Sequence, residues 1–322
     1  MEDSPRRDFA IGDTIINVDH AGLSKYPKDD GRRIRDFQDV MVSVLRLCVA
    51  FCPGCGLPRR CRWIVRTCKK IPLCIEVATL CWAYYTYIYI MCYHLLADRF
   101  LSKWGSIIGY HGTLMICLWP FKQMLVTPLK PVPVSFYVMQ RPGGAQGSRS
   151  YCHHCHLIKP ERCHHCSICG ICVLKMDHHC PWFNTCVSFT NYKFFVLFLF
   201  YSGVHCAYMT ATTFHNFGVD VRREIGFWPD INITFLFLLS IFFGLAFWML
   251  LFFHAYLICR NRTTLELMSS EANRYNLGIC NNMAEVFGRE KRLWLIPVYT
   301  TLGDGASFPV FRENIHKRGS LV

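Results

Sequence analysis

The sequence predicts an all-α membrane protein, with four transmembrane helices and a cytosolic cysteine-rich domain between the second and the third. Composition is the first reason, because 52% of the 322 residues are hydrophobic, against about 45–50% in ordinary soluble domains. The second reason is that this excess lies in four runs, each close to the roughly 20 apolar residues that cross a bilayer. The third reason is the densest cluster of cysteines, which lies between the second and third runs.

The four apolar runs are the predicted spans. They cover residues 71–96, 104–126, 194–214 and 231–259. Polar residues (Glu76, His94 and His111) interrupt the first two runs, and Pro120 lies in the second, so buried helices of a soluble core remain an alternative for that pair. The first 40 residues contain no apolar leader, so we expect the first span to act as its own insertion signal.

Charge predicts the orientation of these spans. Basic residues are concentrated before the first span, between the second and third spans, and after the fourth. The positive-inside rule therefore places three regions in the cytosol: 1–70, 127–193 and 260–322. The net charge of +13 then lies mostly on the cytosolic side. This favours the lipid bilayer over nucleic acid as its partner, since anionic headgroups attract basic segments.

Twenty cysteines indicate either disulfides or metal binding. Disulfides need an oxidising compartment, whereas the densest cluster, YCHHCHLIKPERCHHCSICGICVLKMDHHCPWFNTC from residue 151 to 186, is predicted to be cytosolic. Its cysteine pairs are spaced two residues apart, as in Cys152 and Cys155, and histidines follow. This spacing is typical of tetrahedral zinc sites. Two such sites use eight ligands, and the segment offers more, so some thiols are spare.

This segment resembles the cysteine-rich domain of the DHHC protein S-acyltransferases, the palmitoyltransferases. The resemblance covers roughly residues 71–300. Asp177-His178-His179-Cys180 is its central motif, and Thr263-Thr264-Leu265-Glu266 matches the TTxE motif of the family. Residues 282–288, NMAEVFG, are similar to a C-terminal motif, and WAYYTY at 82–87 is close to the WSYYAY of one branch.

The resemblance implies two interleaved zinc sites, each with three cysteines and one histidine. The first set is Cys152, Cys155, His165 and Cys172, and the second is Cys166, Cys169, His179 and Cys186. Cys163 is left over and is read as a small apolar filler. Both sets are closed, which is typical of structural zinc, whereas a zinc hydrolase needs an open coordination position.

Asp177, His178 and Cys180 then remain for chemistry. A thiol becomes a strong nucleophile as a thiolate, and the zinc ligands on both sides hold His178 near the sulfur. Asp177 is placed to fix the imidazole tautomer and stabilise its cation. The implied enzyme is a protein-cysteine S-palmitoyltransferase. Cys180 takes the acyl group from fatty acyl-CoA, and cysteines of membrane-associated proteins receive it at the cytosolic face.

Six further residues are candidate contacts for the acyl-CoA. Ala83 is a candidate to line the end of an acyl cavity among the spans and His205 to close it, although an intramembrane histidine also bonds to a backbone carbonyl or a tyrosine. Trp182 is read as a wedge at the membrane boundary or as a packing residue of the zinc fold. Lys193, Lys175 and Arg162 are candidates for the CoA phosphates or part of the general cytosolic charge.

Two motifs carry weaker signals. Thr263, Thr264 and Glu266 are expected to dock the catalytic domain or simply to cap a helix. After the DHHC motif, Thr185 and Ser188 replace Asn and Gly of the family pattern. If that glycine has a positive φ, Ser188 is strained there.

Several questions stay open from the sequence. Cysteines before the first span (Cys48, Cys52, Cys55, Cys61 and Cys68) are read as acylation targets or plain thiols rather than another metal site. A scaffold without activity and a small transporter are the competing classes, although a transporter needs paired charges and Glu76 is the one acidic residue in the spans. Golgi, ER and plasma membrane are all possible locations, with Golgi favoured by the resemblance. The oligomeric state is not predicted.

Overall fold

The structure is a computed structural model that describes residues 70–133, 151–219, 226–269 and 273–310. All of these belong to one compact unit, Arg62–Val322. The predicted cytosolic N-terminal segment, with Cys48 to Cys68, lies outside the described residues, as do both chain ends.

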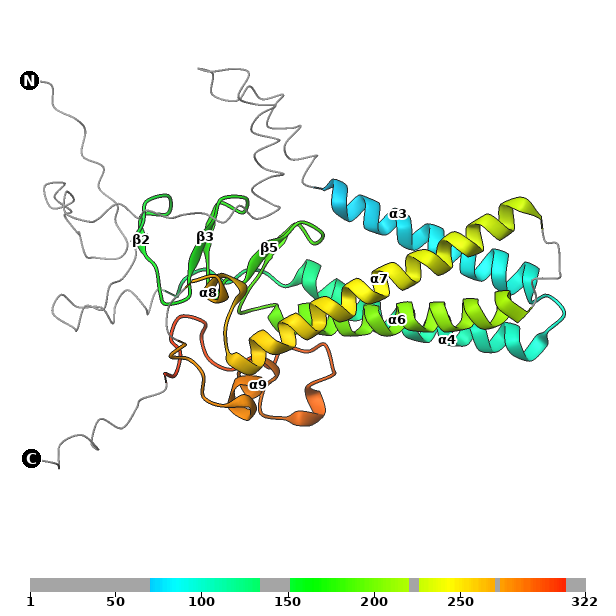
Figure 1. Ribbon diagram of the computed structural model, residues 1–322. Coiled ribbons are helices and arrows are strands. Elements are labelled where there is room, and N and C mark those ends of the chain that lie inside the picture. The colour runs from blue at the N-terminus through cyan, green and yellow to red at the C-terminus, as the bar shows by residue number, and fades with distance from the viewer. Residues whose placement is uncertain (1–69, 134–150, 220–225, 270–272, 311–322) are drawn as a thin grey trace, which may run out of the picture. The chain divides into compact units, whose positions relative to one another are not determined.

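Four long helices pack together in the described part of the chain (Figure 1). They are α3 (Ile71–Tyr85), which continues as the π-helical η2 (Thr86–Leu95), then α4 (Phe100–Val126), α6 (Tyr192–Val219) and α7 (Phe227–Arg260). Within the described ranges, three stretches are long and apolar enough to cross a membrane: Ile71–Leu95, Tyr192–His215 and Phe227–Arg260. The first, third and fourth predicted spans are therefore confirmed by length and composition. The second predicted span forms α4, which is long enough but less apolar.

The third span is the central helix of the bundle. In the most apolar 18-residue stretch of this span, 61% of the residues are buried, against 22% in the first span and 17% in the fourth. The contacts between α4 and α6 run antiparallel: Ser106 lies opposite Tyr208, Thr113 opposite His205 and Cys117 opposite Ser202. The outward side chains of α7 are apolar and exposed, which suits a helix that faces lipid.

The cysteine-rich domain is built from short hairpins rather than helices. Its described strands pair antiparallel as β1 (Tyr151–Cys152) with β2 (Leu157–Ile158), β3 (His164–Cys166) with β4 (Ile171–Val173), and β5 (His178–Cys180) with β6 (Thr185–Val187). The predicted all-α class is therefore correct for the helical bundle and wrong for this domain. Strands of two or three residues are too short to show an apolar alternation in the sequence.

The C-terminal region continues from α7 and packs back against the bundle. It contains α8 (Thr264–Leu267), α9 (Ile279–Phe287) and η3 (Lys291–Leu293). Asn282 of α9 donates from Nδ2 to the carbonyl of Cys259 at 2.8 Å, near the end of α7. This bond satisfies one of the last carbonyls of the helix, which have no partner within it.

Candidate active site and metal centres

The β5–β6 hairpin places two kinds of chemistry on its two faces. Successive side chains of a strand point to opposite faces, so His178 and Cys180 share one face and His179 lies on the other. In the hairpin register His179 pairs with Cys186, and Cys180 pairs with Thr185. One short strand therefore separates the candidate catalytic pair from a candidate pair of metal ligands.

Asp177 and His178 form a close pair on the first of these faces. Nδ1 of His178 lies 2.6 Å from Oδ2 of Asp177, whose side chain is 1% exposed. Burial alone would raise the pKa of Asp177, but the hydrogen bond and charge of His178 hold it below its ordinary value. For His178, burial works against the cation, but the bonds to Asp177 and Cys180 raise its pKa to about 10.

Thr264 completes the set of bonds to Asp177 from the C-terminal side. Its backbone N–H donates to Oδ1 at 2.9 Å, and its hydroxyl donates to Oδ2 at 2.9 Å. Thr263 caps α8 in a capping box with Glu266. The two readings of the TTxE motif are thus both present, since Thr263 caps the helix while Thr264 contacts the DHHC segment.

Cys180 lies where the cysteine-rich domain meets the long helices. It is 5% exposed and belongs to a hydrophobic cluster with Phe183 and residues of three long helices, among them Cys117, Phe198 and Ile258. The ring of Phe183 contacts those of Phe121 and Phe198 at 5.6 and 5.0 Å. The thiol therefore adjoins an apolar interior that continues into the bundle.

Sequence reasoning missed His254, a buried histidine of α7 next to this site. One ligand atom of His254 lies within 4.8 Å of those of Asp177 and His178. Its Nδ1 is 3.0 Å from the hydroxyl of Tyr192, and its ring packs against Phe195 at 4.9 Å. An intramembrane histidine is itself a functional signal, but 254 lies far from the DHHC motif in the chain.

Eight cysteine and histidine side chains gather into two clusters. The first contains Cys152, Cys155, His165 and Cys172, and the second contains Cys166, Cys169, His179 and Cys186. These are the two groups that the family resemblance implies. In each group the histidine lies directly opposite a cysteine in a hairpin: His165 opposite Cys172, and His179 opposite Cys186. Cys163 belongs to neither group and is buried beside Leu174 and Phe189.

The donor geometry of the second cluster fits a tetrahedral zinc ion. Nδ1 of His179 lies 3.6, 3.3 and 3.6 Å from the sulfurs of Cys166, Cys169 and Cys186. Bond lengths of zinc to sulfur and nitrogen predict ligand atoms about 3.4–3.8 Å apart. One ring nitrogen cannot donate a single proton to three thiols, so a shared cation explains the convergence better. In the first cluster, Nδ1 of His165 lies 3.2 and 4.0 Å from the sulfurs of Cys155 and Cys172.

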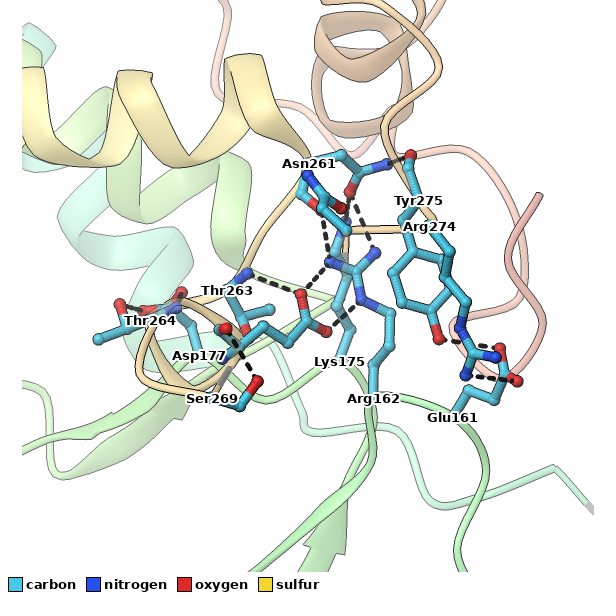
Figure 2. Close-up of polar contacts among 12 residues, drawn as sticks. Glu161, Arg162, Lys175, Asp177, Asn261, Thr263, Thr264, Ser269, Arg274 and Tyr275 are labelled. Atoms are coloured by element: carbon cyan, nitrogen blue, oxygen red, sulfur yellow. Dashed lines mark hydrogen bonds and ion pairs between the residues drawn. The ribbon is translucent and has the colours of Figure 1, made fainter. Parts of the chain in front are cut away.

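A buried polar network joins the cysteine-rich domain to the C-terminal region (Figure 2). Arg162 donates from Nε and Nη2 to both carboxylate oxygens of Glu266, at 2.6 and 2.8 Å. It also bonds to Asn261, the left-handed residue that ends α7, through Nη1 at 3.0 Å. Lys175 pairs with Glu285 at 2.6 Å, and Asn261 donates to the other oxygen of that carboxylate at 2.6 Å. The sequence did not indicate these roles for Asn261 and Glu285.

The structure does not support the three proposed phosphate contacts. Arg162 and Lys175 are buried, and their cationic groups are engaged in this network. Lys193 is 2% exposed, and its ammonium donates to the carbonyls of Leu293 and Val298 and to the hydroxyl of Thr300. All three cations therefore stabilise the packing of the C-terminal region, rather than lying free for CoA phosphates or as general cytosolic charge.

The other candidate contacts lie in two places. Ala83 belongs to an interior cluster of the bundle that also contains Tyr110. His205 is buried, packs on Tyr110 at 5.0 Å and has Nδ1 2.9 Å from the hydroxyl of Thr113. These two residues are thus brought to the same part of the interior. Trp182 is 49% exposed, so it is not a fully buried packing residue.

The two departures from the family pattern cause no backbone strain. Ser188 is not among the described residues with positive φ, so the expectation of strain is wrong. Its N–H donates to Oδ1 of Asn191 at 2.8 Å, and its carbonyl accepts from Tyr192 at 2.9 Å. Ser188 therefore begins the turn that leads into α6. Thr185 pairs with Cys180 across the hairpin.

The fold and site together define a membrane protein with paired Cys3His centres beside an acid–histidine–thiol set. A profile for the DHHC palmitoyltransferase family matches residues 145–271. Palmitoyltransferase ZDHHC15 of Xenopus laevis is 33% identical, over 80% of this chain and 87% of that protein. Palmitoyltransferase ZDHHC2 of Homo sapiens is 36% identical, over 81% of this chain and 80% of that protein.

This chain belongs to the DHHC palmitoyltransferase family and is a protein palmitoyltransferase. The scaffold and transporter alternatives are therefore set aside. Zinc-compatible Cys/His clusters and the use of acyl-CoA agree with this family.

Proposed function

We propose that Cys180 takes a fatty acyl group from acyl-CoA and passes it to a cysteine of a membrane-associated substrate protein. The observation that carries this proposal is the position of Cys180. It shares a strand face with His178, which is paired with Asp177, and its sulfur adjoins the apolar interior of the bundle. A thiol at that boundary meets the thioester while the acyl chain stays out of water.

The proposed reaction has two balanced steps. His178 holds the proton that Cys180 gives up, and the sulfur attacks the thioester carbonyl of acyl-CoA. The bond to the CoA sulfur breaks, and CoA leaves as a thiol with the proton from His178. A substrate thiol then gives its proton to His178 and attacks the acyl-enzyme, which releases Cys180. Asp177 holds His178 in one tautomer and stabilises its cation.

We assign the two Cys3His clusters to zinc ions with a structural role. When bound, the ions supply cross-links that fold hairpins too short to be stable alone. His179 and Cys186 are the ligands on either side of the reactive thiol, and they fix the strand that carries it. Both sets are closed, so no position remains for a metal-bound water.

We further propose that α4 is a fourth span and that the zinc domain lies on the cytosolic side. Contacts between α4 and α6 run from Ser106 and Tyr208 at one end to Phe121 and Phe198 at the other. A helix packed along a spanning helix over that length shares its membrane environment. The Golgi location stays a prediction from the family resemblance.

The two-step scheme is tested by a chase experiment. Acyl-enzyme is formed with radiolabelled palmitoyl-CoA, freed of CoA by gel filtration and mixed with a cysteine-containing substrate peptide. We expect the label to move to the peptide without added acyl-CoA. Label that stays on the enzyme, while the peptide is acylated only when fresh acyl-CoA is present, would contradict the covalent intermediate.

His205 is proposed to limit the length of the acyl chain. It fills the interior together with Tyr110 and Thr113, so a chain that extends from Cys180 into the bundle meets this group. We predict that His205→Ala shifts the preferred acyl-CoA to longer chains. The measurement is competition between acyl-CoAs of increasing length, with His215→Ala near the end of α6 as the control. An unchanged preference in His205→Ala would remove this role.

A further inference from the structure

The segment after α9, residues 289–299, lies against the part of α6 that enters the membrane. Lys193, in the first turn of α6, donates to the carbonyls of Leu293 and Val298 at 2.8 and 3.0 Å. The hydroxyl of Tyr201 donates to the carbonyl of Leu295 at 2.7 Å. Tyr201 lies eight residues beyond Lys193, or about 12 Å along the helix axis. The segment therefore extends along a predicted span rather than away from it.

Residues 289–299 expose apolar side chains beside this part of α6. Leu295 is 58% exposed, Ile296 37% and Tyr299 44%. Its fold is held by Trp294, whose ring packs on Phe287 at 5.7 Å and whose Nε1 donates to the carbonyl of Gly288 at 2.9 Å. Apolar groups that are exposed beside a spanning helix contact lipid rather than water. Their burial in lipid removes apolar surface from water, which is favourable.

Basic side chains precede the apolar ones in the same segment. Arg289, Lys291 and Arg292 are exposed, and Glu290 is the one acidic residue of 289–299. Arg292 pairs with Glu290 at 3.2 Å, but both side chains stay mostly exposed, at 82% and 62%. Three cations and one anion leave an excess of two positive charges. Cations next to outward apolar residues are typical of segments that lie in the membrane interface.

We propose that residues 289–299 bind the membrane surface and select anionic phospholipids. Leu295 and Ile296 enter the acyl region of the leaflet, and Arg289, Lys291 and Arg292 contact the anionic headgroups. The contact goes beyond palmitoyl transfer, because it concerns the lipid around the enzyme. The segment is connected to the site through α9. Glu285 of α9 pairs with Lys175, and the carbonyl of Glu285 accepts a hydrogen bond from the N–H of Leu302 at 3.0 Å.

Site-specific photo-crosslinking in nanodiscs tests this proposal. A diazirine amino acid replaces Leu295 or Ile296 in the full chain, and the nanodisc contains phosphatidylcholine with a minority of phosphatidylserine. After irradiation, mass spectrometry identifies the lipids attached to each position. We expect lipid adducts at both positions, with phosphatidylserine enriched about fivefold over its share of the bilayer, the factor that one basic residue near the surface provides.

Two matched positions calibrate the result. Ile158 of the zinc domain is 40% exposed, close to the value for Ile296, and should give no lipid adduct. Phe242 of α7 is 65% exposed and should give adducts in the bulk lipid ratio. The double variant Lys291→Glu and Arg292→Glu should keep the adducts and lose the enrichment. Adducts at 295 and 296 no more frequent than at 158 would overturn the membrane contact. Adducts in the bulk ratio, or an enrichment that survives the double variant, would overturn the headgroup selection.

Discussion

At the scale of single residues, the site depends on the alternation of one three-residue strand. His178 and Cys180 face the bundle interior, while His179 faces the second metal cluster. An insertion or deletion in this strand would exchange the two faces, because the side-chain period is two. The order His-His-Cys is therefore a geometric requirement as well as a chemical one.

Thr264 offers a direct test of how Asp177 is held. Thr264→Val removes the hydroxyl bond to Oδ2 and keeps the backbone bond to Oδ1. We predict that acyl-enzyme formation slows about tenfold, since one hydrogen bond to a charged group contributes roughly 1.5 kcal/mol. Thr264→Ser keeps the hydroxyl and should retain most of the rate. Stopped reactions with palmitoyl-CoA measure both, and full activity in Thr264→Val would contradict the role.

A variant of Lys193 distinguishes a structural cation from a substrate contact. Lys193→Met removes three hydrogen bonds to the segment between Leu293 and Thr300. We predict a loss of about 2–3 kcal/mol in the free energy of unfolding and an unchanged KM for palmitoyl-CoA. Lys122→Met, at an exposed position of α4, removes the same charge without these bonds and serves as the control. A raised KM with unchanged stability would restore the phosphate role.

At the scale of elements, α8 and α9 are docked on the zinc domain by buried charges. Burial alone would raise the pKa of Glu285, but the charges of Lys175 and Arg162 hold it below its ordinary value of 4.5. Burial and the charge of Arg162 lower the pKa of Lys175 to about 8, although the bond to Glu285 opposes this shift. Removing one member of such a pair lowers the stability of the fold by more than the pair contributes to it, since the other charge stays buried.

The sign of the Glu285 shift predicts an acid-sensitive interface. A carboxylate with a lowered pKa adds stability above its unfolded value, near 4.5, and this stability is lost as the pH falls through the folded value. Glu285→Gln should therefore be less stable than the wild type at pH 7 and should lose less stability on acidification. Thermal unfolding at several pH values measures this. Glu161→Gln, in an exposed pair with Arg274, is the control and should behave like the wild type.

The sequence predicts those features whose determinants lie close together in the chain. Cysteines two residues apart indicate metal binding because their chelate geometry is local, and the eight residues do gather in two groups. The partners of Lys193 lie about a hundred residues away, and a charge by itself says nothing of its burial. For the same reason the sequence does not indicate roles for Asn261 and His254, since both lie far from the DHHC motif in the chain and reach the site only in the folded protein.

At the scale of the whole molecule, α6 links the catalytic strand to the membrane. The N–H of Asp177 donates to the carbonyl of Val187 in β6, and α6 begins within five residues of that strand at a turn fixed by Ser188 and Asn191. The central span therefore continues directly from the reactive hairpin. This connection explains how a folded zinc domain holds one thiol at the end of an apolar interior.

The most direct test of this account is the site of the acyl-enzyme. Purified, zinc-loaded protein is incubated with a palmitoyl-CoA analogue that carries a clickable tail, and the label is challenged with hydroxylamine, which cleaves thioesters. We predict a hydroxylamine-sensitive label in the wild type and in Cys163→Ser, whose thiol is buried outside both clusters. The label should be absent from Cys180→Ser. Equal labelling of Cys180→Ser would show that another thiol carries the acyl group and would contradict the account.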